Sequence, residues 1–213
     1  MPDRSVTRLH LLRHGEVEDF GTRVVRGQLD VSLSAQGLAQ SMRLARWLAS
    51  HEGRPDALLG SDLTRCRILG EELAARSGLD YEATKDLREQ HLGDWEGQTW
   101  STVTEREPER VRAYWADYAH VAPPGGESFE DLVARVSAWW KRERDARGGR
   151  TLWVVTHVGV IRALSSHLLG LPPGEALRLA PATASHTAFL VSEAGAVLTS
   201  FGERPWLFGG DES

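Results

Sequence analysis

Short, almost uninterrupted runs of hydrophobic residues occur three times along the chain, at 9–12, 57–59 and 152–155. Runs of this kind are typical of strands that are buried on both faces of a parallel sheet. A shorter segment at 81–83 predicts an edge strand, and 188–191 with 197–201 predict a closing hairpin.

Between these runs, hydrophobic residues recur every three or four positions, which is the spacing of a helix with one buried face. The spacing predicts helices that begin near Ser34, Asp62 and Ser128, with these three residues as N-caps, and another helix over about 160–169. Ser128 and Asp131 are spaced almost as in a capping box. Strands that alternate with helices predict an α/β fold with a mostly parallel central sheet and helices on both faces.

The remaining segments are polar or aromatic. Residues 16–31 and 86–97 are expected to form loops, and 98–122 to be helical in part, because Trp100, Tyr114, Trp115 and Tyr118 fall within that stretch. We expect one domain over residues 1–213 with a helical cap insertion at about 95–125. Residues 203–213 are expected to form a loosely held tail.

Composition limits the classes of function. The chain has 213 residues and a formal net charge of −5 at pH 7, which argues against general binding of nucleic acid or membrane surfaces. Cys66 is the only cysteine, which excludes an internal disulfide and a thiolate metal cluster. The first residues lack the apolar core of a signal peptide, and no apolar run approaches the roughly 18 residues that cross a bilayer. We expect a cytoplasmic monomer or homodimer with no nucleic acid and no membrane partner.

Two histidines follow buried strands directly: His14 in Arg13-His14-Gly15, and His157 in Thr156-His157. If the two strands are neighbours, both imidazoles face one crevice at the carboxyl edge of the sheet, where open α/β sheets bind ligands. For His14 and Arg13 alone, a surface pair without function is the simpler interpretation.

Arginines surround this crevice. Arg13 precedes His14, and Arg65 lies in the first turn of a predicted helix, where free N–H groups also favour an anion. Two imidazoles and two guanidiniums in one small volume are costly without an anion, and a phosphoryl group supplies one. Glu89 supplies the proton that a leaving alkoxide needs.

Other histidines admit less specific interpretations. His10 lies within an apolar run, where a buried, hydrogen-bonded histidine is more common than a metal ligand. His186 is expected at the rim of the pocket or at the surface, and His91 either tunes Glu89 or has no role in the site. No HExxH pair, P-loop or GxGxxG occurs in the sequence, so we expect no metal and no cofactor.

Six segments, in order, carry a resemblance to a known family: Leu12-Arg13-His14-Gly15-Glu16, Ser61-x-Leu63-x-Arg65, Leu87-Arg88-Glu89, Gly93-x-Trp95-Glu96-Gly97, Pro124-Gly125-Gly126-Glu127-Ser128 and Thr156-His157-x-Gly159. They resemble the motifs of the histidine phosphatase superfamily, which includes the cofactor-dependent phosphoglycerate mutases. The resemblance spans about residues 9 to 170 and implies a three-layer α/β/α sandwich.

The resemblance also implies roles for individual residues. His14 is the nucleophile, Glu89 is the proton donor, and the phosphate is held by Arg13, Arg65 and His157. Family members often carry Thr after Arg-His-Gly-Glu and Asn three positions later, whereas Val17 and Phe20 occupy these positions here. The chain has no Asn, so one hydrogen bond to the phosphate is lost or is supplied by Gln28.

Three functions remain open at this point. The first is a metal-independent phosphomonoesterase that acts on a small phosphorylated metabolite through a phosphohistidine. The second is a phosphoglycerate mutase, which is disfavoured because such mutases carry an extra segment where this chain has only residues 98–122. The third is a non-catalytic binder of phosphorylated ligands, which has no need for both a nucleophile and an acid.

The substrate is a finer question. The loop 92–97 with Trp100, Trp115 and Asp117, and the segment Arg26-Gly27-Gln28-x-Asp30, most resemble alpha-ribazole phosphatases of cobalamin assembly. Aromatic side chains over residues 95–118 could stack on a flat heteroaromatic base. The alternative is that they only pack the cap, and that the enzyme accepts many sugar or glycerate phosphates.

Overall fold

A computed structural model describes residues 6–18 and 20–208, and within them a six-stranded sheet has the order β3-β2-β4-β1-β5-β6. Its strands are β1 (Thr7–Arg13), β2 (Ala57–Ser61), β3 (Tyr81–Thr84), β4 (Thr151–Thr156), β5 (His186–Ser192) and β6 (Gly195–Glu203). The first four strands pair in parallel, whereas β5 and β6 are antiparallel to their neighbours. The predicted mostly parallel sheet and the closing hairpin are thereby confirmed.

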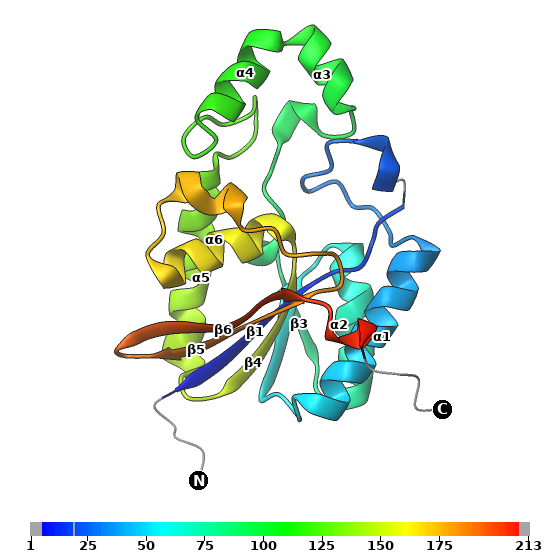
Figure 1. The fold of residues 1–213 in the computed structure, drawn as a ribbon, viewed down its shortest axis with the longest axis vertical. Coiled ribbons are helices and arrows are strands. Elements are labelled where there is room, and N and C mark those ends of the chain that lie inside the picture. Colours follow the sequence, from blue (N-terminus) through cyan, green and yellow to red (C-terminus); the bar gives the residue numbers. More distant parts are fainter. Residues whose placement is uncertain (1–5, 19, 209–213) are drawn as a thin grey trace.

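Helices cover both faces of this sheet (Figure 1). On one side lie α1 (Ala35–His51) and α2 (Thr64–Ser77), and on the other lie α5 (Phe129–Arg147) and α6 (Val158–Leu169). Two more helices, α3 (Trp100–Arg106) and α4 (Pro108–Ala116), lie away from the sheet at the top of the view. The three-layer α/β/α arrangement is confirmed.

Each face of the sheet has its own hydrophobic core. Along β1, Leu9 and Leu11 point into the core beneath α5 and α6, whereas Leu12 points into the core beneath α1 and α2. Every one of these side chains is fully buried. The odd and even positions of β1 therefore belong to different layers, which decides where His10 must lie.

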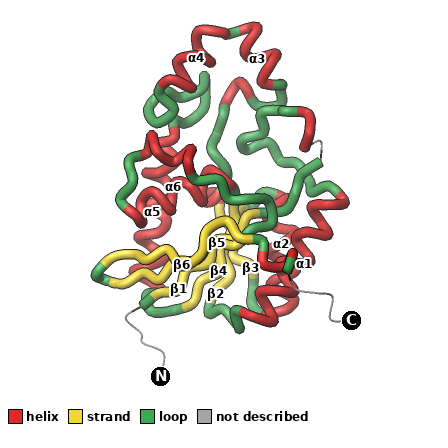
Figure 2. Tube along the Cα trace, viewed as in Figure 1, coloured by secondary structure: helices red, strands yellow, loops and turns green. Residues whose placement is uncertain are grey.

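The cap helices α3 and α4 are joined to the rest by loops, which Figure 2 shows between the sheet and the top of the molecule. Backbone pairing between Val24 and Thr99 ties the loop that follows β1 to the start of α3. Trp95, Trp100 and Tyr114 pack edge to face or stacked within this region. The helical part of 98–122 is thereby confirmed, and the division into one domain with a cap stays a prediction.

The start of α2 differs from expectation. Asp62 is not the N-cap of α2: Leu63 occupies that position without a side-chain cap. Arg88 binds both carboxylate oxygens of Asp62, at 2.6 and 2.7 Å, and the amide of Thr64 donates instead to Asp30 from the loop 16–31. Ser128 and Asp131, by contrast, form a complete capping box.

The segment expected as a loose tail also differs where it is described. Trp206 is buried against the α1 and α2 layer, and its indole N–H donates to the carbonyl of Ala184 at 2.8 Å. A large aromatic ring with a satisfied N–H holds its segment in place, so the expectation was wrong for residues 203–208. Residues 209–213 lie outside the described part of the chain.

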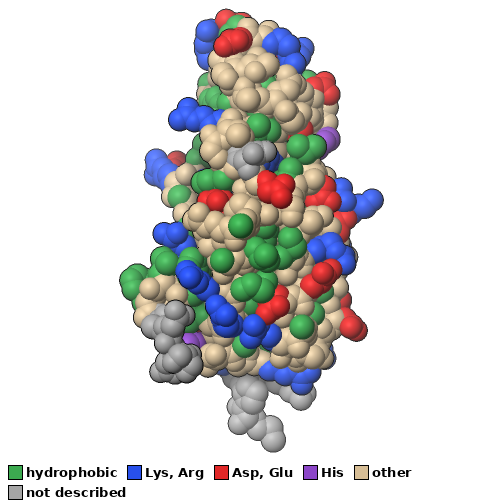
Figure 3. Space-filling view, turned by 90° about the vertical axis from the view of Figure 1, so that its right-hand side faces the viewer, with side chains coloured by type: hydrophobic (Ala, Val, Ile, Leu, Met, Phe, Trp, Pro, Cys, Tyr) green, Lys and Arg blue, Asp and Glu red, His purple; other side chains and the backbone are tan. Residues whose placement is uncertain are grey.

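Charged side chains of both signs are spread over the face in Figure 3, and hydrophobic side chains are exposed in groups between them. In the described residues, no helix is long and apolar enough to span a membrane.

Candidate active site

The candidate site lies where β1 and β4 end side by side. Arg13 pairs with Thr156 in the parallel ladder, so His14 and His157 follow at equivalent positions of adjacent strands. Their ring centroids lie 5.1 Å apart. The condition for a shared crevice, that the two strands be neighbours, is met.

His14 is held in one tautomer. Its Nδ1 donates to the carbonyl of Gly15 at 2.7 Å, which leaves Nε2 with a lone pair. Burial and the nearby charge of Arg65 lower the pKa of His14 well below its usual value. The imidazole is therefore neutral at neutral pH, the form that can attack phosphorus.

Gly15 is required by close packing. Gly15 does not adopt a positive φ. A Cβ at this position would lie 2.1 Å from the carbonyl oxygen of Gly37 in the first turn of α1. The segment after His14 therefore rests directly on α1, and this contact fixes the backbone that carries the imidazole.

Arg65 connects the site to the loop above it. Its two terminal nitrogens donate to the carbonyls of Leu29 and Gly27, each at 2.7 Å, and its Nε donates to Nδ1 of His157 at 3.2 Å. The guanidinium is almost fully buried. Arg65 thereby orders the loop 16–31 and orients His157 through one side chain.

Arg13 contributes a second guanidinium. One of its terminal nitrogens donates to the carbonyl of Pro181 at 2.7 Å, while its buried Nε has no partner among the described residues. Burial lowers the pKa of Arg13 to about 10, so it remains charged at neutral pH. Arg13 also lines the adjacent cavity, where its positive charge would favour an anion.

His157 is fully buried behind His14. Its Nε2 lies 2.8 Å from Oγ of Ser61, and Sγ of Cys66 lies 3.4 Å from the same nitrogen. Burial and the charge of Arg65 lower the pKa of His157 well below its usual value. Cys66 is itself fully buried and belongs to the hydrophobic core beneath α1 and α2.

Glu89 reaches the site from the loop that follows the 3₁₀ turn Lys85–Leu87. One carboxylate oxygen accepts from the amide of Gln90 at 2.9 Å, and the other accepts from the amide of Gly159 at 3.2 Å. A Cβ on Gly159 would lie 2.1 Å from the first of these oxygens. The glycine two residues after His157 therefore makes room for the carboxylate and also binds it.

Arg13, His14, Arg65 and Glu89 border a cavity of about 320 Å³, whereas His157 is not among its lining residues. Basic groups, one carboxyl group and several apolar or aromatic side chains share the lining. The lining includes Arg13, His14, Arg26, Arg65, Glu89, Arg162, Phe20, Trp100, Tyr114, Trp115, Tyr118 and Leu177. The lining therefore offers both positive charge for an anion and apolar surface for a less polar group.

Three residues that the sequence placed in or near the site do not line the cavity: Gln28, His91 and His186. The side-chain amide of Gln28 donates to the backbone carbonyl of Glu89 at 3.1 Å, and Gln28 does not line the cavity. His91 lies half exposed, near Glu96, with its backbone amide bonded to Glu127. Both expected positions for His186, the pocket rim and the surface, were wrong: it is buried in β5 and bonded to His10.

Sequence reasoning missed Arg162. This residue lines the cavity from α6, and its Nε donates to the carbonyl of Leu179 at 2.6 Å. Its spacing contained a usable signal, because Val158 and Arg162 are four residues apart on a helix that starts directly after His157. The cavity therefore holds more positive charge than the two arginines of the motifs supply.

A neutral imidazole with a lone pair on Nε2, a carboxyl group and several guanidiniums around one cavity are chemically suited to a phosphate monoester. Residues 9–204 match the sequence profile of the Histidine phosphatase superfamily (branch 1). The chain belongs to this family.

Relatives within the family are named for different substrates. The chain is 38% identical over 174 residues to a glucosyl-3-phosphoglycerate phosphatase of Mycolicibacterium vanbaalenii, covering 78% of this chain and 76% of that protein. It is 32% identical over 164 residues to a metal-independent phosphoserine phosphatase of Arabidopsis thaliana, covering 76% and 68%.

One of the similar solved structures, a putative alpha-ribazole-5'-P phosphatase from Escherichia coli, superposes with a TM-score of 0.85 at 26% identity, covering 93% and 97%. The expected class of enzyme, a hydrolase of phosphate monoesters, is confirmed by this family and these relatives.

Proposed function

We propose that the protein is a metal-independent phosphomonoesterase that works through a phosphohistidine on His14. The observation that carries the proposal is the tautomer of His14: Gly15 accepts from Nδ1, so the free lone pair is on Nε2, beside the cavity. Arg13, Arg65 and Glu89 line the same cavity as His14, and the ring centroid of His157 lies 5.1 Å from that of His14, which supports the roles that the family resemblance implies.

The first chemical step transfers the phosphoryl group. Nε2 of His14 attacks phosphorus, the bond from phosphorus to the ester oxygen breaks, and Glu89 in its acid form gives its proton to the leaving alkoxide. Arg13 and Arg65, with Arg162 beside them, meet the negative charge on the phosphoryl oxygens, and His157 completes the binding site. No metal ion is required for this stabilisation.

The second step releases phosphate. Water attacks the phosphohistidine, Glu89 now accepts a proton from that water, and the bond from Nε2 to phosphorus breaks. His14 returns to its neutral form, which burial and the neighbouring guanidiniums favour. A mutase would instead return the phosphoryl group to a second hydroxyl group.

For the substrate we propose a small phosphorylated metabolite with a flat, weakly polar portion, with alpha-ribazole 5'-phosphate as the first candidate. Trp115 supports this candidate, because its ring lines the cavity and is 49% exposed. An aromatic face at a cavity rim is suited to stack on a heteroaromatic base.

A glucosyl phosphoglycerate is the second candidate substrate. The identity of 38% to a phosphatase named for such a compound favours it, and so does Arg162, whose positive charge could meet a carboxylate close to the phosphate. The other guanidiniums would then be left to hold the phosphoryl group.

The test compares kcat/KM for alpha-ribazole 5'-phosphate, glucosyl-3-phosphoglycerate, 3-phosphoglycerate, fructose phosphates and phosphoserine. We expect the highest value for alpha-ribazole 5'-phosphate, and a loss of about tenfold for this substrate alone in Trp115→Ala. A higher value for another compound rejects this substrate but retains the phosphatase. Conversion of 3-phosphoglycerate to its isomer with a bisphosphate primer would show a mutase, and absence of turnover of every ester would favour a binder.

A further inference from the structure

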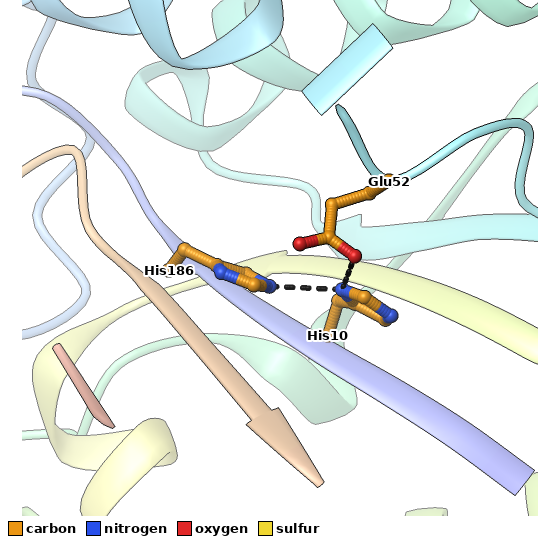
Figure 4. Close-up of side chains that lie close together, drawn as sticks. All are labelled: His10, Glu52 and His186. Atoms are coloured by element: carbon orange, nitrogen blue, oxygen red, sulfur yellow. Dashed lines mark hydrogen bonds and ion pairs between the residues drawn. The ribbon is translucent and has the colours of Figure 1, made fainter. Parts of the chain in front are cut away.

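A second pair of buried histidines lies on the face of the sheet that is covered by α1 and α2. His10 is in β1 and His186 begins β5, and the antiparallel register pairs Leu12 with His186. The two imidazoles are therefore diagonal neighbours on one face. Glu52, the residue after α1, reaches the same place from the helical layer (Figure 4).

The three side chains point toward one another. Nδ1 of His10 lies 2.8 Å from Nε2 of His186 and 3.9 Å from Oε2 of Glu52, and all three atoms lie within 4.8 Å of one another. Around a tetrahedral ion with bonds of about 2.0–2.1 Å, ligand atoms lie roughly 3.3 Å apart. Small side-chain rotations would bring the three atoms to that spacing.

The groups at this cluster would suit a cation. Two imidazole nitrogens and one carboxylate oxygen converge on one place, and in the described part of the chain Glu52 has no ion pair with an arginine or lysine. A divalent cation would interact favourably with all three groups.

We propose that His10, His186 and Glu52 bind one Zn²⁺ ion, with water as the fourth ligand. Two imidazole nitrogens and one carboxylate oxygen form a ligand set that suits zinc, whereas calcium and magnesium prefer oxygen ligands alone. The side chain of Glu52 is 29% exposed, which leaves a path for solvent. A hollow of about 210 Å³, lined in part by Gly53 and Trp153, lies beside the cluster.

The position of the ion gives it a structural role. It links β1 to β5 just below the point where the amide of Arg13 donates to Ser185 and the amide of Ala184 donates to His14. Bound zinc therefore restrains the two segments that hold the end of β1. The ligands do not line the catalytic cavity, so the ion takes no part in phosphoryl transfer.

The first experiment measures binding of Zn²⁺ to the chelator-treated full chain by equilibrium dialysis, with Co²⁺ absorption as a probe of coordination by nitrogen and oxygen. We expect one ion per chain. At a Zn²⁺ concentration 100-fold above Kd, Tm should rise by about 5–10 °C. An absence of stoichiometric binding by the wild type would overturn the proposal.

Variants identify the ligands. Glu52→Gln keeps both imidazoles and lies at a partly exposed position, so it should fold, and we expect it and His186→Gln to weaken binding by about 100-fold or more. His51→Gln changes the exposed histidine next to Glu52, and His120→Gln changes an exposed histidine paired with Asp117, so both serve as matched controls. Unchanged affinity in Glu52→Gln and His186→Gln, or equal loss in the controls, would overturn the proposal.

A last pair of measurements separates this site from the catalytic cavity. His14→Gln should retain the one bound ion, because its imidazole is not a ligand in the proposal. EDTA should reverse the rise in Tm while kcat for p-nitrophenyl phosphate stays within about twofold. Loss of the ion in His14→Gln would assign the metal to the catalytic cavity and would overturn the proposal.

Discussion

Two pairs of buried histidines each have one member on or directly after β1, and the charges around the two pairs differ. His14 and His157 stand past the ends of β1 and β4, and His10 and His186 lie on β1 and β5. All four are buried, and burial lowers the pKa of each. Burial alone therefore does not tell a nucleophile from a metal ligand.

The partners of each pair make the difference. Arg13 and Arg65 lie beside His14, so the charge of a ligand bound there should be negative, as that of a phosphate group is. Glu52 lies beside His10, so an incoming group must be positive. The same neutral imidazole can use its lone pair on phosphorus in one pair and on a metal ion in the other.

The strongest test of this comparison replaces one histidine of each pair, His14 or His10, in separate variants. His14→Ala removes the nucleophile, and kcat for any phosphate ester should fall by at least about 10⁴-fold. His10→Gln, four residues earlier on the same strand, should retain kcat within about threefold. Steady-state assays with p-nitrophenyl phosphate measure both.

The covalent intermediate provides the control for this test. Wild type quenched in alkali after brief incubation with substrate should carry a base-stable, acid-labile phosphoryl group on His14. A phosphoryl group on another residue, or full activity in His14→Ala, would contradict the assignment.

Replacement of Glu89 tests the acid at the same cavity. Glu89→Gln should slow alkyl phosphate esters by about 10²–10⁴-fold, because their leaving oxygen needs a proton. p-Nitrophenyl phosphate should be slowed much less, since its phenolate is stable without one. The ratio of the two kcat values measures the effect, and equal slowing of both esters would remove Glu89 from this role.

A smaller effect is expected when Glu89 is moved rather than removed. Gly159→Ala places a Cβ where the carboxylate now lies, 2.1 Å from one oxygen, so hydrolysis of alkyl esters should fall by about 10–100-fold. Gly174→Ala is the matched control, because no heavy atom lies within 4 Å of its added Cβ. Alkyl-ester activity in Gly159→Ala equal to that of the control would mean that the position of Glu89 is unimportant.

The sequence predicted the strands and the residues at their ends because both depend on local signals. Hydrophobic runs located β1, β2 and β4, and the residue after each strand of a parallel sheet must lie at its carboxyl edge. The order of the strands was not predicted, so His14 and His157 could be brought together only on the condition that β1 and β4 are neighbours, which the structure meets.

Features that depend on contacts between distant segments could not be predicted. Asp30 replaces Asp62 at the start of α2 because the loop 16–31 folds back onto that helix. His186 meets His10 only through the register of β5 against β1, and a one-residue shift would turn His186 to the other face. Arg162 had a helical spacing signal, but its distance from the phosphate site depends on how α6 is oriented.

The smallest expected effect is on how the free energy of unfolding depends on pH through His10, measured with a chelator present so that no zinc is bound. The pKa of His10 is about 3 in the folded chain and near 6.5 when unfolded, so the unfolded chain binds more protons between these values. The free energy of unfolding therefore falls as pH decreases from about 6.5, by about 1.4 kcal/mol per pH unit for one histidine, a tenfold change in the unfolding equilibrium constant.

His10→Gln should reduce the slope measured by urea unfolding between pH 4.5 and 6 by about this amount. His120→Gln should change the slope little in this range, because Asp117 raises the pKa of this exposed histidine and it is therefore protonated in both the folded and the unfolded chain. An unaltered slope in His10→Gln would mean that His10 is not neutral in the folded chain, and the contrast between the two pairs would then fail at its premise.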